Sequence, residues 1–414
     1  MNLIPQIAAY IKSGETKDQR LGLEVEHFIV NDKGIQIDFH EISSLIKEIA
    51  DKIGADVFYM DGYPVGYAAD GYTTSLEPAC QFEISIDPFK EIDEIKRVYE
   101  AFIDLWEPVF ESRGYHFVVK GNLPLVELGI LDPADIALSP KKRYIFMDEY
   151  FKKSGKYGKH MMRASASSQI SIDYSSEKDM VRKLRLLQKI SPVLMIMMEN
   201  KTDDNSTLPG VKDIKHLQRI QEWDDIDPDR TGFIPHSFDE DFGYEKMAQV
   251  ICNVPLILYT EDGVTEGVGS KSASDLINEG RQLHNIEHII SMGFFHMRVK
   301  KYIEIRVADA VPISKALGYV ALIKGIVYSD SALTLLEKEL ENIDDASKIQ
   351  EAVERIEKAG FEAVIYNGRT AGQWADHLIG IASGNLIEGE REYLNHVRAF
   401  RSYGKPENNG QQTA

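Results

Sequence analysis

The chain has 414 residues, of which 43% are hydrophobic and 27% charged, so it can bury the core of one large α+β body or of two domains. Its formal net charge of −19 gives no sign of the basic face that binds nucleic acid, and we predict no nucleic-acid partner. Two cysteines are too few for a disulfide scaffold, and no run of about 18 apolar residues predicts a membrane span. We therefore expect a protein of the reducing cytoplasm.

Hydrophobic periodicity predicts alternating helices and strands up to residue 313 and helices beyond it. The expected helices cover residues 5–13, 42–54 and 91–114, and another begins with the capping pattern SSEKD near residue 175. The expected strands cover residues 20–30, 73–87, 115–124, 168–175, 253–260 and 297–309. Because no repeat or flexible linker interrupts the chain, we expect one domain over residues 1–400 and a disordered tail at 401–414.

Four of the expected strands combine an apolar face with a polar face, because side chains alternate along a strand. In RLGLEVEHFIV (residues 20–30), Glu24 and Glu26 share the face opposite Leu23 and Val25. The other three strands repeat the pattern, and their polar faces carry Glu77, Gln81, Glu83, Gln169, Glu304 and Arg306. If helices cover the apolar faces, the polar faces would line one groove.

The glutamates in this set predict a metal site. In one groove their like charges would raise each other's pKa unless a cation lay between them. Carboxylate clusters suit Mg²⁺ or Mn²⁺ better than Zn²⁺. The candidate ligands are Glu24, Glu26, Glu77, Glu83 and Glu304. The alternative is a solvated sheet face, which needs no metal, and strand parity alone leaves open whether the four strands are neighbours.

Phosphate binding would have to rely on metal ions and basic side chains, because the chain has no GxxxxGK[ST] loop and no GxGxxG after a strand. The densest basic stretch, residues 140–163, contains Arg143, Lys159 and Arg163, and its glycines predict a mobile loop. The alternative is an ordinary solvated surface loop. Arg230 in DPDRTGFIP is a second candidate, although DRTG is also typical of a capped turn.

No Ser-His-Asp or Cys-His pattern predicts a covalent mechanism. His27 and Cys80 both fall on the apolar side of their strands, which indicates packing rather than catalysis. The chemistry of the groove would therefore come from its carboxylates and cations.

Six segments, in order along the chain, carry a resemblance to a known family. They are RLGLEVEHF, SLEPACQFEIS, PKKRY, MMR followed by SQISIDYSSEKDMVRK, WDDIDPDRTGFIP and RVKKYIEIRVAD. With these segments the chain resembles the plant-type glutamate–cysteine ligases, a family shared by plants and some bacteria. The resemblance extends over residues 5–330 and becomes loose in the C-terminal quarter.

The resemblance implies a glutamine-synthetase-like catalytic fold, an α+β architecture in which a curved antiparallel sheet forms a funnel backed by helices. It implies an ATP- and Mg²⁺-dependent ligase that activates the γ-carboxylate of L-glutamate as an acyl phosphate. Attack by L-cysteine would then give γ-glutamylcysteine, the first step of glutathione biosynthesis. The partners of such a monomer or homodimer would be ATP, glutamate, and cysteine or another amine.

The resemblance also assigns roles to residues of this chain. The five glutamates match metal positions, and Arg230 and Arg306 match the basic groups that would bind phosphate or a substrate carboxylate. The segments expected to contact ATP or substrate contain Gln81, Gln169, Arg143, Lys159 and Arg163.

Three departures from the family pattern lie near the expected substrate strands. Ala79-Cys80 replaces Gly-Gly, Val307 to Val311 replaces a glycine-containing segment, and Arg163 stands one residue early, which leaves Ala164 at the family's arginine position. Glycines let a substrate approach the backbone, and a shift of one residue turns a strand side chain to the other face. An alternative is therefore a ligase with the same chemistry and a different carboxylate or amine. A non-catalytic binding protein and a metal-dependent hydrolase also stay open.

Overall fold

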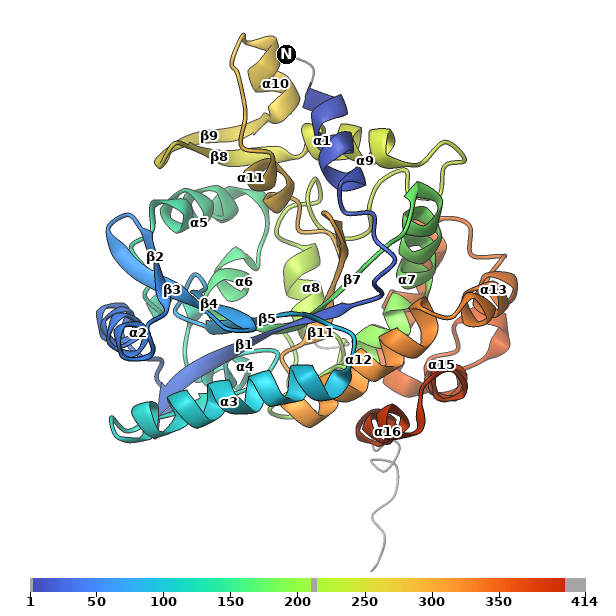
Figure 1. Ribbon diagram of the computed structural model, residues 1–414, viewed down its shortest axis with the longest axis horizontal. Coiled ribbons are helices and arrows are strands. Elements are labelled where there is room, and N and C mark those ends of the chain that lie inside the picture. Colours follow the sequence, from blue (N-terminus) through green and yellow to red (C-terminus); the bar gives the residue numbers. More distant parts are fainter. Residues whose placement is uncertain (1–2, 210–213, 399–414) are drawn as a thin grey trace, which may run out of the picture.

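The computed structural model describes residues 3–209 and 214–398 and has the expected α+β architecture (Figure 1). The stretch 401–414, for which we expect disorder, lies outside the described residues. A central sheet crosses the molecule, and long helices lie along one of its faces (Figure 1).

Within the described residues the central sheet has nine strands, and its strand pairs are antiparallel. The strand order is β10 (Met297–Val299), β11 (Ile303–Asp309), β7 (Ser167–Ile172), β1 (Leu21–Asn31), β5 (Phe82–Phe89), β4 (Tyr72–Leu76), β3 (Tyr63–Ala69) and β2 (Asp56–Met60). The ninth strand, β6 (Tyr115–Val118), pairs with the far end of β1. A separate hairpin is formed by β8 (Pro255–Glu261) and β9 (Val264–Ser272).

Helices connect and cover these strands. The N-terminal half contains α1 (Leu3–Lys12), α2 (Phe39–Ile53), α3 (Ile92–Glu111), α4 (Pro124–Glu127), α5 (Lys142–Ser154), α6 (Gly158–Ala164) and α7 (Glu177–Met197). Then follow α8 (Gln218–Asp224), α9 (Tyr244–Asn253), α10 (Ala273–Asn278) and α11 (Ile286–Ser291). The predicted helical C-terminal part is confirmed as α12 (Ile313–Val327), α13 (Asp330–Glu339), α14 (Ala346–Ala359), α15 (Ala371–Asn385), α16 (Glu388–Arg391) and α17 (Asn395–Arg398).

The apolar face of the sheet packs against α3 and α12 (Figure 1). On α3, buried aromatic and aliphatic residues recur at helical spacing, and the Trp106 ring lies edge-on to Phe82 of β5 with centroids 4.8 Å apart. Full burial of each such side chain contributes roughly 1.5–3 kcal/mol. Nearly every side chain of α12 is buried, so this helix forms the centre of the core.

The alternation predicted for the first strand is confirmed. In β1, Leu23, Val25 and His27 are buried, whereas Glu24 and Glu26 turn to the opposite face and are partly exposed. His27 is fully buried, with Nδ1 3.0 Å from the Phe82 carbonyl oxygen and Nε2 2.8 Å from the Tyr99 hydroxyl. Burial lowers the pKa of His27 to about 4, as expected for a packed side chain.

Three expected elements differ from the structure. The expected strand 73–87 is two strands, β4 and β5, joined by a turn at 77–81 in which Cys80 has a φ of 66°. The expected strand 297–309 divides into β10 and β11. The basic stretch 140–163, expected as a mobile loop, instead forms α5 and α6, because its apolar residues pack against the body while its lysines other than Lys141 are exposed.

Within the described residues, no helix by itself has the length and apolar composition to cross a membrane. By length and composition alone, α12 and α13 together would be long and apolar enough to cross a membrane, but they are bent by 84° at the break between them.

Candidate functional site

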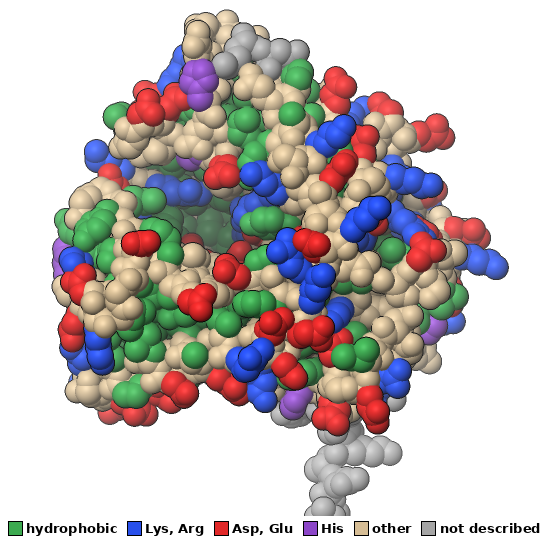
Figure 2. Space-filling model, viewed as in Figure 1, with side chains coloured by type: hydrophobic (Ala, Val, Ile, Leu, Met, Phe, Trp, Pro, Cys, Tyr) green, Lys and Arg blue, Asp and Glu red, His purple; other side chains and the backbone are tan. Residues whose placement is uncertain are grey.

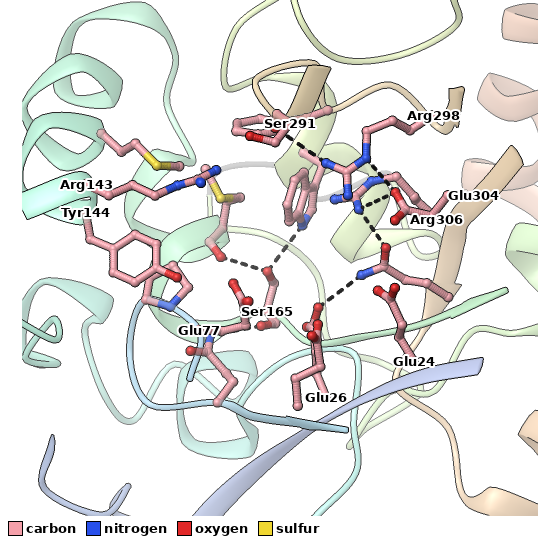
Figure 3. A pocket seen from close by; sticks show the side chains of 18 of the residues that line it. Glu24, Glu26, Glu77, Arg143, Tyr144, Ser165, Ser291, Arg298, Glu304 and Arg306 are labelled. Carbon is pink, nitrogen blue, oxygen red and sulfur yellow. Dashed lines mark hydrogen bonds and ion pairs between the residues drawn. The ribbon is translucent and has the colours of Figure 1, made fainter. Parts of the chain in front are cut away.

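A cavity of about 290 Å³ opens on the polar face of the sheet, and residues of α5 and α6 form part of its lining. Figure 2 shows this hollow, and Figure 3 shows that acidic and basic side chains point into it from different elements. Its charged and amide lining comprises Glu24, Glu26, Glu77, Gln81, Glu83, Arg143, Gln169, Arg298, Lys300, Glu304 and Arg306. The predicted convergence of the polar strand faces is therefore confirmed.

Sheet register explains why the glutamates meet. Glu26 lies directly opposite Glu83 across the β1–β5 pair, and Glu24 lies opposite Gln169 across the β1–β7 pair. Because β7 also pairs with β11, Glu304 lies on the next strand of the same face, opposite Ser171. The strands that carry the predicted residues are thus neighbours in the order β11, β7, β1, β5.

The turn at 77–81 brings Glu77 into the cavity, although Glu77 does not lie on a strand. Gln81 fixes this turn: its Oε1 accepts from the Ala79 backbone N–H at 2.9 Å, and its Nε2 donates to the Ser165 carbonyl oxygen at 3.0 Å. Burial raises the pKa of the Cys80 thiol to about 12, in agreement with a packed cysteine.

We call Glu24, Glu26, Glu77 and Glu83 the acidic wall. Burial and the nearby Glu77 raise the pKa of Glu26 to about 7, even though Glu26 accepts from the Ser167 backbone and hydroxyl at 2.8 and 2.9 Å. Burial and Glu24 raise the pKa of Glu83 well above its ordinary value. Glu24 has no hydrogen bond or ion pair to another described residue, and burial raises its pKa too. The wall therefore holds more negative charge than its own partners neutralise.

We call Arg298, Lys300, Glu304 and Arg306 the cationic wall, and Figure 3 labels all of these except Lys300. The Glu304 carboxylate is fully buried, and its oxygens lie 2.6 Å from Arg298 Nε, 3.0 Å from Lys300 Nζ and 3.0 Å from Arg306 Nη1. Burial alone would raise the pKa of Glu304, but the three cations outweigh it and hold the pKa well below its ordinary value. With three cations and one carboxylate, this wall retains an excess of positive charge.

Arg143 reaches the cavity from the first turn of α5. Within the described residues its guanidinium has no carboxylate within ion-pair distance, and its side-chain contact is Met292 Sδ at 3.9 Å. A guanidinium without a protein carboxylate is suited to bind the carboxylate or phosphate of a ligand. The structure thus agrees with the placement predicted for Arg143.

Three predicted basic residues do not line the cavity. Arg230 is fully buried, with Nε 2.8 Å from Asp227 Oδ2 and its guanidinium among aromatic rings. Arg163 is bound to Asp148 Oδ1 at 2.5 Å, and Lys159 is exposed on α6. Local partners or solvent take up the charges of these three side chains, and the binding roles predicted for them stay predictions.

Sequence reasoning missed Arg298 and Lys300, together with the cavity residues Tyr144, Ser165 and Trp223. A signal for the two cations was present, because Arg298 and Lys300 have the same parity as Glu304 and Arg306 in RVKKYIEIR. Lys141 belongs to the basic stretch 140–163, the candidate for phosphate binding, and its ammonium donates to the Leu76 carbonyl and lies 5.1 Å from the Tyr144 ring centre. Burial lowers the pKa of Lys141 to about 8, against the attraction of Glu77.

The acidic wall fits a hard divalent cation by the type of its donors. Its oxygens come from carboxylates, Glu24 lacks a protein partner, and a cation would relieve the repulsion that raises the pKa values of Glu24, Glu26 and Glu83. No three His, Cys, Asp or Glu side chains in the described part of the chain are arranged to hold one metal ion together. The five-glutamate metal site stays a prediction, and Glu304 is already neutralised by cations of the protein.

The fold and the cavity define a class of protein: an α+β protein whose antiparallel sheet presents carboxylates and cations to one small-molecule pocket. More specifically, the chain belongs to the glutamate-cysteine ligase family 2, whose family model matches residues 20–398. This membership agrees with the resemblance drawn from the six segments.

Individual relatives are more distant. The chain is 29% identical over 336 residues to a chloroplastic glutamate–cysteine ligase of Medicago truncatula, and 28% identical over 339 residues to one of Arabidopsis thaliana. These matches cover 78% and 79% of this chain, but only 64% and 63% of the relatives. The chain thus spans less than two thirds of the length of these relatives.

A solved structure of glutamate–cysteine ligase from Francisella tularensis, in complex with AMP, has a related fold. It superposes with a TM-score of 0.52 at 12% sequence identity and covers 93% of this chain and 81% of the solved chain. This likeness supports the α+β fold.

Proposed function

We propose that this protein is an ATP- and Mg²⁺-dependent ligase that joins the γ-carboxylate of L-glutamate to the amine of L-cysteine, giving γ-glutamylcysteine for glutathione biosynthesis. The observation that carries the proposal is a single pocket with walls of opposite charge, in a chain of the glutamate-cysteine ligase family 2. Transfer of a phosphoryl group between anions depends on charge neutralisation and positioning rather than on a nucleophilic side chain.

In the first half-reaction, a γ-carboxylate oxygen of glutamate attacks the terminal phosphorus of ATP, and the bond to ADP breaks. Arg143, Lys300 and Arg306 would bind the anionic groups of the two substrates, since their cationic groups line the cavity. Glu24, Glu26, Glu77 and Glu83 would hold Mg²⁺, which when bound neutralises phosphate charge. Because these carboxylates converge in one cavity, bound substrates would displace water from the same sites.

In the second half-reaction, the amine nitrogen attacks the acyl carbon, inorganic phosphate leaves and the nitrogen loses a proton. Met147, Met161 and Phe294 form an apolar part of the cavity beside the charged walls. An apolar surface there would accommodate the side chain of the amine substrate and exclude water from the acyl phosphate, whose hydrolysis would waste ATP. The nucleophile is the substrate amine, so no side-chain nucleophile is required.

A specific observation favours the second candidate, a ligase of the same mechanism with another carboxylate or amine. Arg163 is engaged by Asp148, and Ala164 at the neighbouring position is buried. Neither residue supplies the arginine contact that the family pattern places there.

We also propose that the sheet and its helices form a glutamine-synthetase-like funnel. In this proposal residues 1–400 form one catalytic domain, and the protein is cytoplasmic.

The test is ADP release by the purified protein with ATP and Mg²⁺ across a panel of amino acids, offered singly and in pairs, with product masses recorded. Release that requires glutamate and cysteine together, with a γ-glutamylcysteine mass, supports the proposal. Release with a different pair favours the second candidate. Phosphate release without an amine indicates a hydrolase, and no release with any pair indicates a binding protein.

A further inference from the structure

Gln169 of β7 connects the two walls of the cavity. Its amide oxygen accepts from Arg306 Nη1 at 2.6 Å, and its amide nitrogen donates to Glu26 Oε1 at 3.2 Å and to the Ser167 hydroxyl at 3.0 Å. The Gln169 side chain is 4% exposed, so the bridge is buried. The result is a continuous chain of contacts from Glu26 through Gln169 and Arg306 to Glu304.

The chemistry of its neighbours fixes the orientation of this amide. Arg306 can only donate hydrogen bonds, and the Glu26 carboxylate accepts the bond it makes here. Rotation of the amide by half a turn would place its nitrogen against a guanidinium and its oxygen against a carboxylate. Gln169 therefore has one favourable orientation, and both of its hydrogen-bonding ends are used within the protein.

The position of Arg306 depends on few contacts. Its Nη1 is shared between Gln169 Oε1 at 2.6 Å and Glu304 Oε2 at 3.0 Å. The guanidinium also lies against the Trp223 ring, with its carbon 5.7 Å from the ring centroid. Without Gln169, one of the two hydrogen bonds that aim this nitrogen would be lost.

We propose that Gln169 is a positioning residue that acts through Arg306, rather than a ligand of ATP or substrate. It holds the Arg306 guanidinium at the cavity surface, between the acidic wall and Trp223, in the place where an anion would bind. The kinetic part of this inference rests on the proposed ligase function, and its structural part does not.

The kinetic test is a double-mutant cycle. Gln169→Met has nearly the same shape and removes both hydrogen-bonding ends, and we expect kcat/KM of the ligation to fall about tenfold, the effect of one charged hydrogen bond. In an Arg306→Ala background, Gln169→Met should cause less than about a twofold further loss, because the group it positions is gone. A further tenfold loss in that background would show direct contact with ligand and would overturn the proposal.

A second readout needs no turnover. Trp223 lines the cavity beside Arg306, whereas Trp106 and Trp374 are buried in the core. Gln169→Met and Arg306→Ala should therefore shift the tryptophan emission in the same direction, and the shift should vanish when Trp223 is replaced by Phe. Unchanged emission in Gln169→Met would contradict the proposal.

The matched control is Gln188→Met on α7. Gln188 is also fully buried, donates to the Ser237 hydroxyl at 3.0 Å and accepts from the Ile234 backbone at 3.1 Å, but it does not line the cavity. The Gln188→Met variant should have a lower melting temperature than the parent, with unchanged Trp223 emission and unchanged kcat/KM. If the parent protein ligates no pair of amino acids, the proposed function fails, while the emission comparison still decides the role of Gln169.

Discussion

The acidic wall, on β1, β5 and the turn at 77–81, and the cationic wall, on the β10–β11 hairpin, lie on one sheet with β7 between them, but their charges are balanced differently. Glu304 brings three cations together and neutralises part of their charge, so the cationic wall is held by ion pairs within the protein. The acidic wall has hydroxyl and amide partners for Glu26 and Glu83, and no cation within ion-pair distance of Glu24. One wall is preformed by ion pairs, whereas the described cations nearest the other wall attract its carboxylates from beyond ion-pair distance.

This difference separates stability from ligand binding. Removal of the carboxylate at the centre of the cationic wall leaves three partly buried cations without their shared anion, which destabilises the fold. Removal of a carboxylate from the acidic wall relieves repulsion, so the fold should tolerate it while the binding of a divalent cation suffers. The following predictions test this contrast, beginning with the largest expected effect.

Glu304→Gln should lower the free energy of unfolding by about 3–5 kcal/mol, since three partly buried cations lose the buried anion that they share. Urea denaturation followed by circular dichroism measures this. The control is Glu279→Gln, because Glu279 forms an ion pair with Lys271 at 2.8 Å on the surface and should change stability by less than about 1 kcal/mol. Equal stabilities for the two variants would refute the assignment of Glu304 as the anchor of the cationic wall.

Glu24→Gln and Glu83→Gln should each reduce ligation about a hundredfold at a fixed Mg²⁺ concentration, since weaker cation binding removes charge neutralisation. Their melting temperatures without metal should stay the same or rise. Initial rates at several Mg²⁺ concentrations, together with calorimetric Mn²⁺ binding, check this prediction. Normal rates and unchanged Mn²⁺ binding in both variants would remove the case for a metal at this wall.

The stability of the metal-free protein should fall as the pH rises from 6.5 to 8. The pKa of Glu26 is about 7 in the fold and near its ordinary value of 4.5 in the unfolded chain, so the folded state binds more protons in this interval. The loss from Glu26 should be about 1 kcal/mol over this interval, and it should be smaller in Glu26→Gln. His27, with a pKa of about 4 in the fold and an ordinary value of 6.5 in the unfolded chain, opposes part of this loss equally in both proteins, so the comparison with Glu26→Gln isolates Glu26. An equal change in the free energy of unfolding between pH 6.5 and 8 in the parent and in Glu26→Gln would contradict the raised pKa.

The smallest expected effect is on stability at Cys80, which lies in the same turn as Glu77. Its φ of 66° lies in the left-handed region, where a β-branched side chain is strained. Cys80→Val should be less stable than Cys80→Gly by at least about 1 kcal/mol in urea denaturation. Glycine relieves backbone strain but loses the buried thiol, so Cys80→Gly should remain within about 1 kcal/mol of the parent. Equal stabilities of the Gly and Val variants would argue against the left-handed turn.

The strand faces could be predicted because alternation is a local property. Glu24, Glu26 and Glu83 needed only the two-residue period of a strand to be placed on one surface. Glu77 was assigned to that surface for a wrong reason, since the chain turns at 77–81 with a cysteine in a conformation that usually signals glycine.

Tertiary contacts explain the remaining errors. Arg230 follows two aspartates in a polar segment that is typical of a surface turn, yet aromatic side chains from α5 and residue 294 enclose it completely. The basic stretch 140–163 contains apolar residues at helical spacing, but its charge density and glycines favoured a loop. The bridge through Gln169 could not be predicted, because it depends on strand pairing between distant parts of the chain.

The positions of the strands along the chain also constrain the order in which this site can assemble. Strands β1, β4 and β5 lie within the first 89 residues, whereas β10 begins at residue 297 and β11 at residue 303. During synthesis the acidic wall is therefore complete in sequence long before the cationic wall leaves the ribosome. Closing such a long loop carries an entropic cost and slows folding. The opposite charges of the two walls attract each other across the chain, so the same side chains that form the pocket can guide the late docking of β11 onto β7.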